Sequence, residues 1–298
     1  MPPLVLDPRP ATPLTEEQAS RLVSDIGIPP CPAVLTDMLK ETRRDEPDFN
    51  LIGRLVARDI GLSATLLKTV NSPFYGLQRK VTSVQQATMF LGLRQVTNLV
   101  TGLLLRQAFS VARGDVTTML WDGASRSAAT LAWLAREVGF ADADEAYTFG
   151  LFRDCGMLLL GRKYPAYDRL VLEHGLTHGS PLVRAEAALF PVGHASVGFH
   201  MAKSWYLPEE LAWAVRHHHD GTVLAAATQP AERRRAALVA LGLVADALTR
   251  ALADGADPSA DAEAKAAFDF LGLAPSDAPT LVDGLAHALA ADDEEDDP

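Results

Sequence analysis

The feature that most constrains the fold is the apolar run from Ala146 to Leu160, which contains a single charged pair, Arg153-Asp154. The run is too short to span a bilayer, so it predicts a helix buried in the middle of a globular core. Two adjacent charges are costly in such a place unless each has a partner. Two interpretations follow: a structural ion pair in which Arg153 reaches outward, or the remains of a metal site of which Asp154 is one ligand.

The composition of the whole chain favours helices around a substantial core. Hydrophobic residues make up 48% of the sequence and charged residues 22%, a balance typical of folded proteins. Alanine and leucine dominate, whereas only 5 Tyr and 4 Trp are present, and no alternating strand pattern of convincing length occurs. The predicted fold class is therefore all-α.

The net charge and the terminal sequence limit the partners and the location. A formal net charge of -11 provides no basic surplus to replace phosphate counterions, so no nucleic-acid partner is expected. The N-terminus shows neither a basic start nor a long apolar segment, and no uncharged run reaches transmembrane length. The two cysteines, Cys31 and Cys155, are too far apart in sequence to give ligand or redox spacing. We expect a cytoplasmic protein with no membrane partner.

Turn-forming and charged segments divide the chain into four parts. Proline-rich residues 1–14 predict a flexible tail, and residues 15–112 predict a first helical lobe. Arg113-Gly-Asp115 marks the predicted boundary, and residues 113–290 are predicted to form a second helical lobe. The acidic run at residues 291–298 is predicted to be disordered, because like charges cannot bury apolar area. We expect the two lobes to share an interface, since their short connection leaves little room for independent motion.

Histidines and carboxylates in the second half of the chain indicate a candidate site. They lie on segments predicted to be helical and largely buried, and they are Asp154, His194, His217, His218 and Asp246. Such side chains bind Fe, Mn and Zn in hydrolytic sites, where the metal lowers the pKa of its bound water. His217 and His218 project about a third of a turn apart on a helix, so both are expected to reach one cavity, with His219 pointing toward solvent. Histidines at a helix end also satisfy terminal carbonyls, so the residues alone leave a purely structural role open.

Several motifs together resemble the HDOD domains, helical bacterial output modules related to the HD phosphohydrolases. The resemblance extends over about residues 17–250. Its most specific segments are Asn71-Ser-Pro-Phe-Tyr-Gly76 in the first half and Trp205-Tyr-Leu-Pro208 in the second. The other matching segments are Ile28-Pro-Pro-Cys-Pro32, Val56-Ala-Arg-Asp-Ile-Gly-Leu-Ser63, Ser83-Val-Gln-Gln-Ala87, Gly150-Leu-Phe-Arg-Asp-Cys-Gly156, His194-Ala-Ser-Val-Gly198 and the His217–His219 run.

The resemblance also indicates where this chain departs from the catalytic HD relatives. Those relatives take two metal ligands from an adjacent His-Asp pair on the buried helix, whereas this chain has Arg153-Asp154. They take a further His from the preceding long helix, where this chain has Gly123. The Arg153 guanidinium can pair with Asp154 and Asp246 in place of a metal. The second lobe is therefore expected to be a degenerate HD-like bundle that holds no metal and no other cofactor.

The resemblance implies that the protein is a non-catalytic module of bacterial signal transduction, which acts by protein–protein interaction. Its expected partners are signalling or regulatory proteins, with cyclic-di-GMP and motility circuits as the implied setting. A small ligand such as a nucleotide is compatible with the degenerate pocket, which comprises Arg153, Asp154, His194, His217, His218 and Asp246. The alternative is a metal-dependent phosphohydrolase with an altered ligand set, against which the charge of Arg153 counts.

Overall fold

The computed structural model of the chain describes residues 25–71, 79–109, 115–174 and 180–293. These residues form helices and their connections, with no strand among them, so the all-α prediction is confirmed. The predicted tail at residues 1–14 and most of the Asn-Ser-Pro-Phe-Tyr-Gly motif lie outside the described residues.

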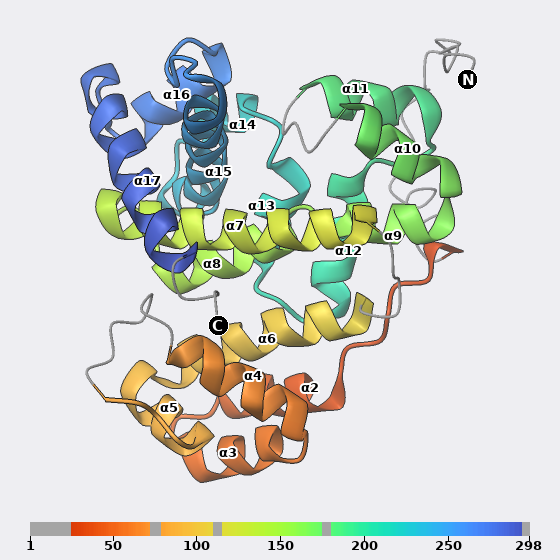
Figure 1. Cartoon of the computed structure of the whole chain (residues 1–298), viewed down its shortest axis with the longest axis vertical. Helices are drawn as coiled ribbons and strands as arrows, with labels where there is room; N and C mark the ends of the chain where they lie inside the picture. The colour runs from red at the N-terminus through yellow and green to blue at the C-terminus, as the bar shows by residue number, and fades with distance from the viewer. Residues whose placement is uncertain (1–24, 72–78, 110–114, 175–179, 294–298) are drawn as a thin grey trace.

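A first group of helices lies together on one side of the molecule (Figure 1). Its members are α2 (Ala33–Glu41), α3 (Phe49–Ala57), α4 (Ile60–Val70), α5 (Val84–Leu91) and α6 (Leu93–Phe109). Three of these helices begin at a side chain that accepts hydrogen bonds from first-turn N–H groups, namely Asp48 for α3, Asp59 for α4 and Ser83 for α5. Gly92, with a φ of 85°, separates α5 from α6, because glycine adopts this backbone conformation without a steric cost.

A second group of helices is built around the long helix α15 (Pro230–Asp254). Its other members are α7 (Asp115–Val138), α8 (Ala143–Phe152), α9 (Cys155–Lys163), α10 (Pro165–His174), α11 (Ser180–Leu189), α12 (His194–Ser204), α13 (Glu209–His217), α14 (Thr222–Ala226), α16 (Ala262–Phe270), the 3-10 helix η2 (Pro275–Asp277) and α17 (Ala278–Asp293). Helix α17 includes residues 291–293, which the charge pattern predicted to be disordered, while residues 294–298 lie outside the described part of the chain.

Helix α15 is, among the described residues, the one helix long and apolar enough to cross a membrane by length and composition alone. In the structure, 72% of its most apolar window is buried, and it packs against α7, α8, α13, α16 and α17. A capping box begins the helix, in which Glu232 accepts a hydrogen bond from the Gln229 N–H at 3.0 Å. Helix α15 thus buries its apolar residues inside the fold.

The buried run from Ala146 to Leu160 forms two helices, so the prediction of one continuous helix is wrong. Helix α8 ends at Phe152 and α9 begins at Cys155, which leaves Arg153 and Asp154 in the turn between them. The predicted burial is correct, because the whole segment from residue 148 to residue 160 is buried.

After the break, α9 packs closely on α12. At Gly156, an added Cβ would overlap the carbonyl oxygen of His194, so α9 can approach the start of α12 only because this residue has no side chain. The turn after α8 directs α9 into that contact.

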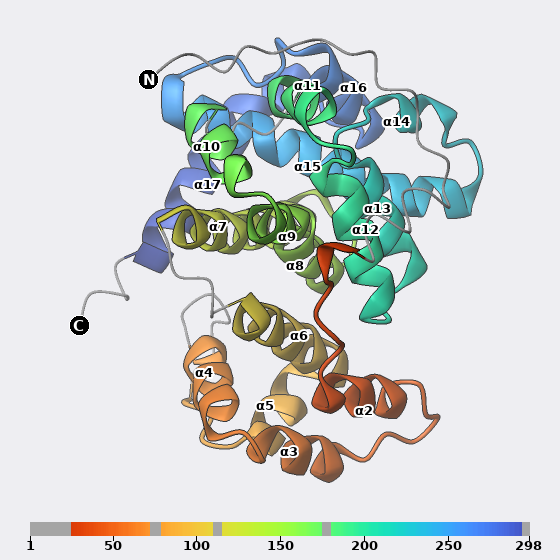
Figure 2. The ribbon, with the colours of Figure 1, turned by 90° about the vertical axis from the view of Figure 1, so that its right-hand side faces the viewer.

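The two groups of helices meet where α6 packs on α8 (Figure 2). Gly102 of α6 lies directly against Leu151 of α8, and an added Cβ at Gly102 would overlap the leucine side chain. At the start of α6, Arg94 lies 3.1 Å from a carboxylate oxygen of both Asp142 and Glu145. The boundary between the two predicted lobes falls on a segment that is only partly described, so its position stays a prediction.

Candidate functional site

The turn between α8 and α9 places Arg153 inside the second group of helices. The residue is 2% exposed and forms two ion pairs: Nε lies 3.3 Å from Asp154 Oδ2, and Nη2 lies 2.5 Å from Asp246 Oδ1 on α15. Nη1 donates a hydrogen bond to the Gly242 carbonyl oxygen at 3.5 Å. Burial alone would lower the pKa of Arg153, but the carboxylates of Asp246 and Asp154 outweigh burial and raise that pKa. Arg153 is therefore a permanent cation that joins the α8–α9 turn to α15.

His194, the first residue of α12, is fully buried and is held by Glu186 of α11. Its Nδ1 lies 2.8 Å from both carboxylate oxygens of Glu186, and its backbone N–H donates to Oε2 at 3.1 Å. The Tyr167 hydroxyl of α10 donates to Oε1 of the same carboxylate. Burial lowers the pKa of His194, but the Glu186 carboxylate more than offsets burial, and the pKa is raised. Because Nδ1 is directed at Glu186, Nε2 of His194 faces the other members of the site.

Two consecutive histidines that follow α13 complete the site. Nδ1 of His218 lies 2.7 Å from the Val215 carbonyl oxygen, and its Nε2 lies 3.3 Å from both Asp154 Oδ1 and His194 Nε2. Nε2 of His219 lies 2.9 Å from His194 Nε2. Burial lowers the pKa of both His218 and His219, which favours their neutral forms. We call the set Asp154, His194, His218 and His219 the histidine cluster; one donor atom from each lies within 4.8 Å of the others.

His217 does not belong to the histidine cluster, contrary to the prediction that His217 and His218 share one cavity. Its ring centroid lies 4.5 Å from that of Trp213, and its Nδ1 lies 3.8 Å from Asp220 Oδ2. His219, which was predicted to point toward solvent, joins the cluster instead. The prediction assigned two adjacent helical residues to one cavity, whereas α13 ends at His217 and the next two residues form a turn.

Glu186 and Tyr167 support the site but were not among the predicted residues. A signal for Glu186 exists in the sequence, since this carboxylate lies on the same face of α11 as the buried residues Leu182 and Ala185. No local pattern marks Tyr167, because its hydroxyl meets Glu186 only through the tertiary fold. Gly123, at the position where the catalytic relatives carry a further His, is half-buried on α7 and has no side chain to offer.

The donor atoms of the histidine cluster fit a metal ion. Imidazole nitrogen and carboxylate oxygen are the ligands that Zn²⁺ and similar divalent ions prefer. Glu186 and the Val215 carbonyl fix the rings of His194 and His218 through Nδ1, which is how ligating histidines are oriented in metalloproteins. Asp246, by contrast, is engaged by Arg153. The residues present therefore suit one ion better than two.

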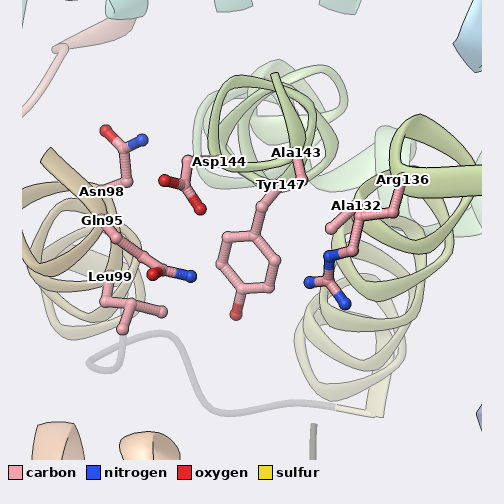
Figure 3. A pocket seen from close by; sticks show the side chains of 8 residues that line it. All are labelled: Gln95, Asn98, Leu99, Ala132, Arg136, Ala143, Asp144 and Tyr147. Carbon is pink, nitrogen blue, oxygen red and sulfur yellow. The ribbon is translucent and has the colours of Figure 1, made fainter. Parts of the chain in front are cut away.

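A separate small cavity, partly open to solvent, lies between α6, α7 and α8. Figure 3 shows Tyr147 of α8 projecting between α6 and α7, with Gln95 of α6 on one side and Arg136 of α7 on the other. Burial raises the pKa of Asp144, which also lines the cavity. The residues that line this cavity are distinct from the histidine cluster and were not among those predicted from the sequence.

Solved structures of known proteins share this fold. An HDOD domain protein with unknown function from Geobacter sulfurreducens has a TM-score of 0.70 and 23% identity, over 93% of this chain and 96% of that chain. A "Putative phosphohydrolase" from Shewanella amazonensis SB2B has a TM-score of 0.68 and 18% identity, over 92% of this chain and 96% of that chain. A "Putative signal transduction protein" from Marinobacter aquaeolei VT8 has a TM-score of 0.66 and 24% identity, over 95% of this chain and 61% of that chain. At these identities, the likeness establishes the fold alone.

Sequence comparison gives the family. An "Uncharacterized protein" from Treponema pallidum (strain Nichols) is 26% identical over 218 residues, which are 69% of this chain and 41% of that protein. This chain therefore spans only 41% of the length of that curated relative. The HDOD domain itself matches residues 28–221, which is well over half of the chain and agrees with the resemblance of the motifs. This protein belongs to the HDOD domain family.

Proposed function

We propose that this protein is a non-catalytic regulatory module of bacterial signal transduction, located in the cytoplasm, that acts by binding other proteins. The observation that carries this proposal is the position of Arg153. A hydrolase of the related type uses buried carboxylates to hold its metals. Here the guanidinium contacts Asp246 Oδ1 at 2.5 Å and Asp154 Oδ2 at 3.3 Å. A fixed cation thus engages two carboxylates that a dinuclear hydrolytic centre would need.

The burial of the histidine cluster also supports a non-catalytic role. A catalytic metal keeps an open coordination position that water and substrate can reach. His194 is 0% exposed, His218 is 1% exposed and Asp154 is 8% exposed. Such burial impedes access of a phosphodiester to the donor atoms, and it argues equally against a nucleotide in the degenerate pocket.

Exposed apolar side chains on the first group of helices support a protein-binding role. Ile60 of α4 is 84% exposed, and Met89 and Phe90 of α5 are 77% and 67% exposed. Helices α4 and α5 pack against each other, so these side chains lie on neighbouring elements. Exposed apolar side chains that gather in one patch mark contact sites for other proteins. The family resemblance makes a signalling or regulatory protein of a cyclic-di-GMP or motility circuit the expected partner.

The alternative function is a metal-dependent phosphohydrolase, which the histidine cluster and the name of the Shewanella structural neighbour favour. The test is hydrolysis of phosphodiesters and nucleotides by untagged protein supplied with Mn²⁺, Fe²⁺ or Zn²⁺. We expect no turnover above that of the His219→Ala variant, which lacks one donor of the cluster at a partly exposed position. Metal-dependent turnover by the natural chain that His219→Ala abolishes would replace the regulatory proposal with the enzymatic one.

The protein-binding part of the proposal is tested with three immobilised baits. They are the natural chain, the double variant Met89→Ser with Phe90→Ser, and Leu172→Ser as the matched control, since Leu172 of α10 is 62% exposed. We expect the same specific partner to be retained by the natural chain and by Leu172→Ser and to be lost by the double variant. Equal retention by all three baits would contradict the assignment of this surface.

A further inference from the structure

We propose that the histidine cluster binds one divalent transition-metal ion through Nε2 of His194, His218 and His219 and Oδ1 of Asp154, with the Arg153 guanidinium in the place of a second cation. This inference reverses the expectation of a metal-free site, which counted Gly123 and Arg153 as lost ligands and placed His219 in solvent. It concerns the same site as the proposed function but does not depend on it, because a bound ion can stabilise a protein without any catalysis.

The distances between the donor atoms match the edges of a small coordination polyhedron. A tetrahedral ion with ligand bonds of about 2.0–2.1 Å has ligand–ligand edges of about 3.3 Å. His194 Nε2 lies 2.9 Å from His219 Nε2, 3.3 Å from His218 Nε2 and 3.5 Å from Asp154 Oδ1. His218 Nε2 lies 3.3 Å from Asp154 Oδ1. These four of the six donor–donor edges lie within a few tenths of an ångström of the tetrahedral value, and one donor atom from each of the four residues lies within 4.8 Å of the others.

The hydrogen bonds behind the cluster leave acceptor atoms facing one another. Nδ1 of His194 meets the Glu186 carboxylate, and Nδ1 of His218 meets the Val215 carbonyl oxygen, so each Nδ1 carries the proton of its neutral ring. Both Nε2 atoms are then acceptors, and they converge on a third acceptor, Asp154 Oδ1. Three buried acceptors in contact need a cation or an extra proton between them. A metal ion satisfies all three at once, whereas one proton on His194 serves fewer of them.

The charge of the surrounding groups points to a divalent ion. Asp154, Asp246 and Glu186 carry three negative charges, and Arg153 carries one positive charge, which leaves two negative charges when the imidazoles are neutral. Buried charge without compensation is costly, and a divalent ion neutralises the excess. Because Arg153 engages Asp246 Oδ1 and Asp154 Oδ2, it supplies the positive charge that a second ion would otherwise bring.

A bound ion would stabilise the fold. They come from the start of α9, the start of α12 and the turn after α13, so a bound ion connects three segments that are distant in sequence. A site with four protein ligands and no open position is typical of structural metal centres. The bound ion should therefore raise the melting temperature of the protein.

The experiment uses the full-length chain without a polyhistidine tag, since a tag would bind metal of its own. Protein freed of metal is titrated with Co²⁺, whose visible absorption reports its coordination geometry, and Zn²⁺ uptake is counted by elemental analysis after desalting. His219→Ala removes one donor at a partly exposed position. His217→Ala is the matched control, because the neighbouring His217 packs on Trp213 and lies outside the cluster.

We expect one equivalent of metal per chain and a tetrahedral Co²⁺ spectrum for the natural chain and for His217→Ala. Removing a residue that only hydrogen-bonds a metal ligand lowers metal affinity by roughly 10–100-fold. Because His219→Ala removes a ligand itself, we expect a larger loss of metal affinity for this variant. Removing metal with a chelator should lower the melting temperature of the natural chain and of His217→Ala, and should leave that of His219→Ala unchanged.

Three results would overturn the inference. If the folded natural chain takes up neither Co²⁺ nor Zn²⁺, the acceptor atoms of the cluster are satisfied by a proton on His194 and not by a metal ion. If the natural chain and His219→Ala bind the metal with equal affinity, the metal is bound adventitiously at surface histidines and not at the cluster. Two equivalents, of which Asp246→Asn removes one, would overturn the role given to Arg153. None of these results depends on hydrolysis, so this inference and the proposed function can fail separately.

Discussion

Arg153 is the residue on which the charge balance of the second group of helices depends. The resemblance to the HD relatives implied its two ion pairs, with Asp154 and Asp246, and the distances confirm them. The apolar run alone left open an Arg153 that reaches outward, whereas the residue is 2% exposed. His219 and Glu186 could not be assigned in the same way, because their roles depend on where α13 ends and on how α11 lies against α12.

At the scale of the residue, Arg153→Met should destabilise the protein strongly. The substitution keeps apolar volume but leaves Asp154 and Asp246 buried without their cation, which costs about 3–5 kcal/mol in comparable pairs. The free energy of unfolding is measured by urea denaturation, with Arg162→Met on the exposed side of α9 as the control. The control should change that free energy by less than about 0.5 kcal/mol. Equal effects of both substitutions would mean that water reaches the two carboxylates.

At the scale of the element, helices were easier to predict than their ends. Apolar residues at helical spacing indicate that a helix exists, but they mark neither the break at Arg153-Asp154 nor the end of α13 at His217. The site prediction was wrong at His217 because it was not tied to the buried face of α13. Ala214 and Val215 lie on that face, and its helical spacing leads to His218 and His219, whereas His217 lies away from it.

The contact between α9 and α12 predicts an unusual response to an alanine substitution. Gly156→Ala should destabilise the protein by about 3 kcal/mol, although alanine favours a helix by about 1 kcal/mol over glycine, because its Cβ would overlap the backbone of His194. Gly161→Ala is the control within the same helix, since its Cβ would meet only the end of the Asp168 side chain, at 2.8 Å. Thermal unfolding of both variants is the measurement. A stability for Gly156→Ala equal to that of the control would contradict the close packing of α9 on α12.

At the scale of the whole molecule, fold class and family were predictable, whereas the arrangement of the helices was not. Leu- and Ala-rich helical patterns and the family motifs were sufficient for the all-α assignment. The contact of α6 with α8 depends on Gly102 fitting against Leu151, and neither residue is marked in the sequence as a member of an interface.

The same interface predicts how the protein responds to a cut between the two groups of helices. A protease recognition sequence that replaces residues 110–114 would allow cleavage between α6 and α7. We expect the two fragments to elute together on size exclusion and to separate only in denaturant, because α6 stays packed on α8. Separate elution of two folded halves would show that this packing is too weak to hold them together.

The distance along the chain between Arg153 and Asp246 also determines when the protein can finish folding during its synthesis. The two residues are 93 positions apart, an interval that a ribosome translates in on the order of ten seconds. Throughout that time the guanidinium lacks its partner on α15, so the turn between α8 and α9 must remain hydrated. A nascent chain that stops before α15 therefore cannot close its interior, and such truncated chains should be recognised by cellular proteases before they can accumulate.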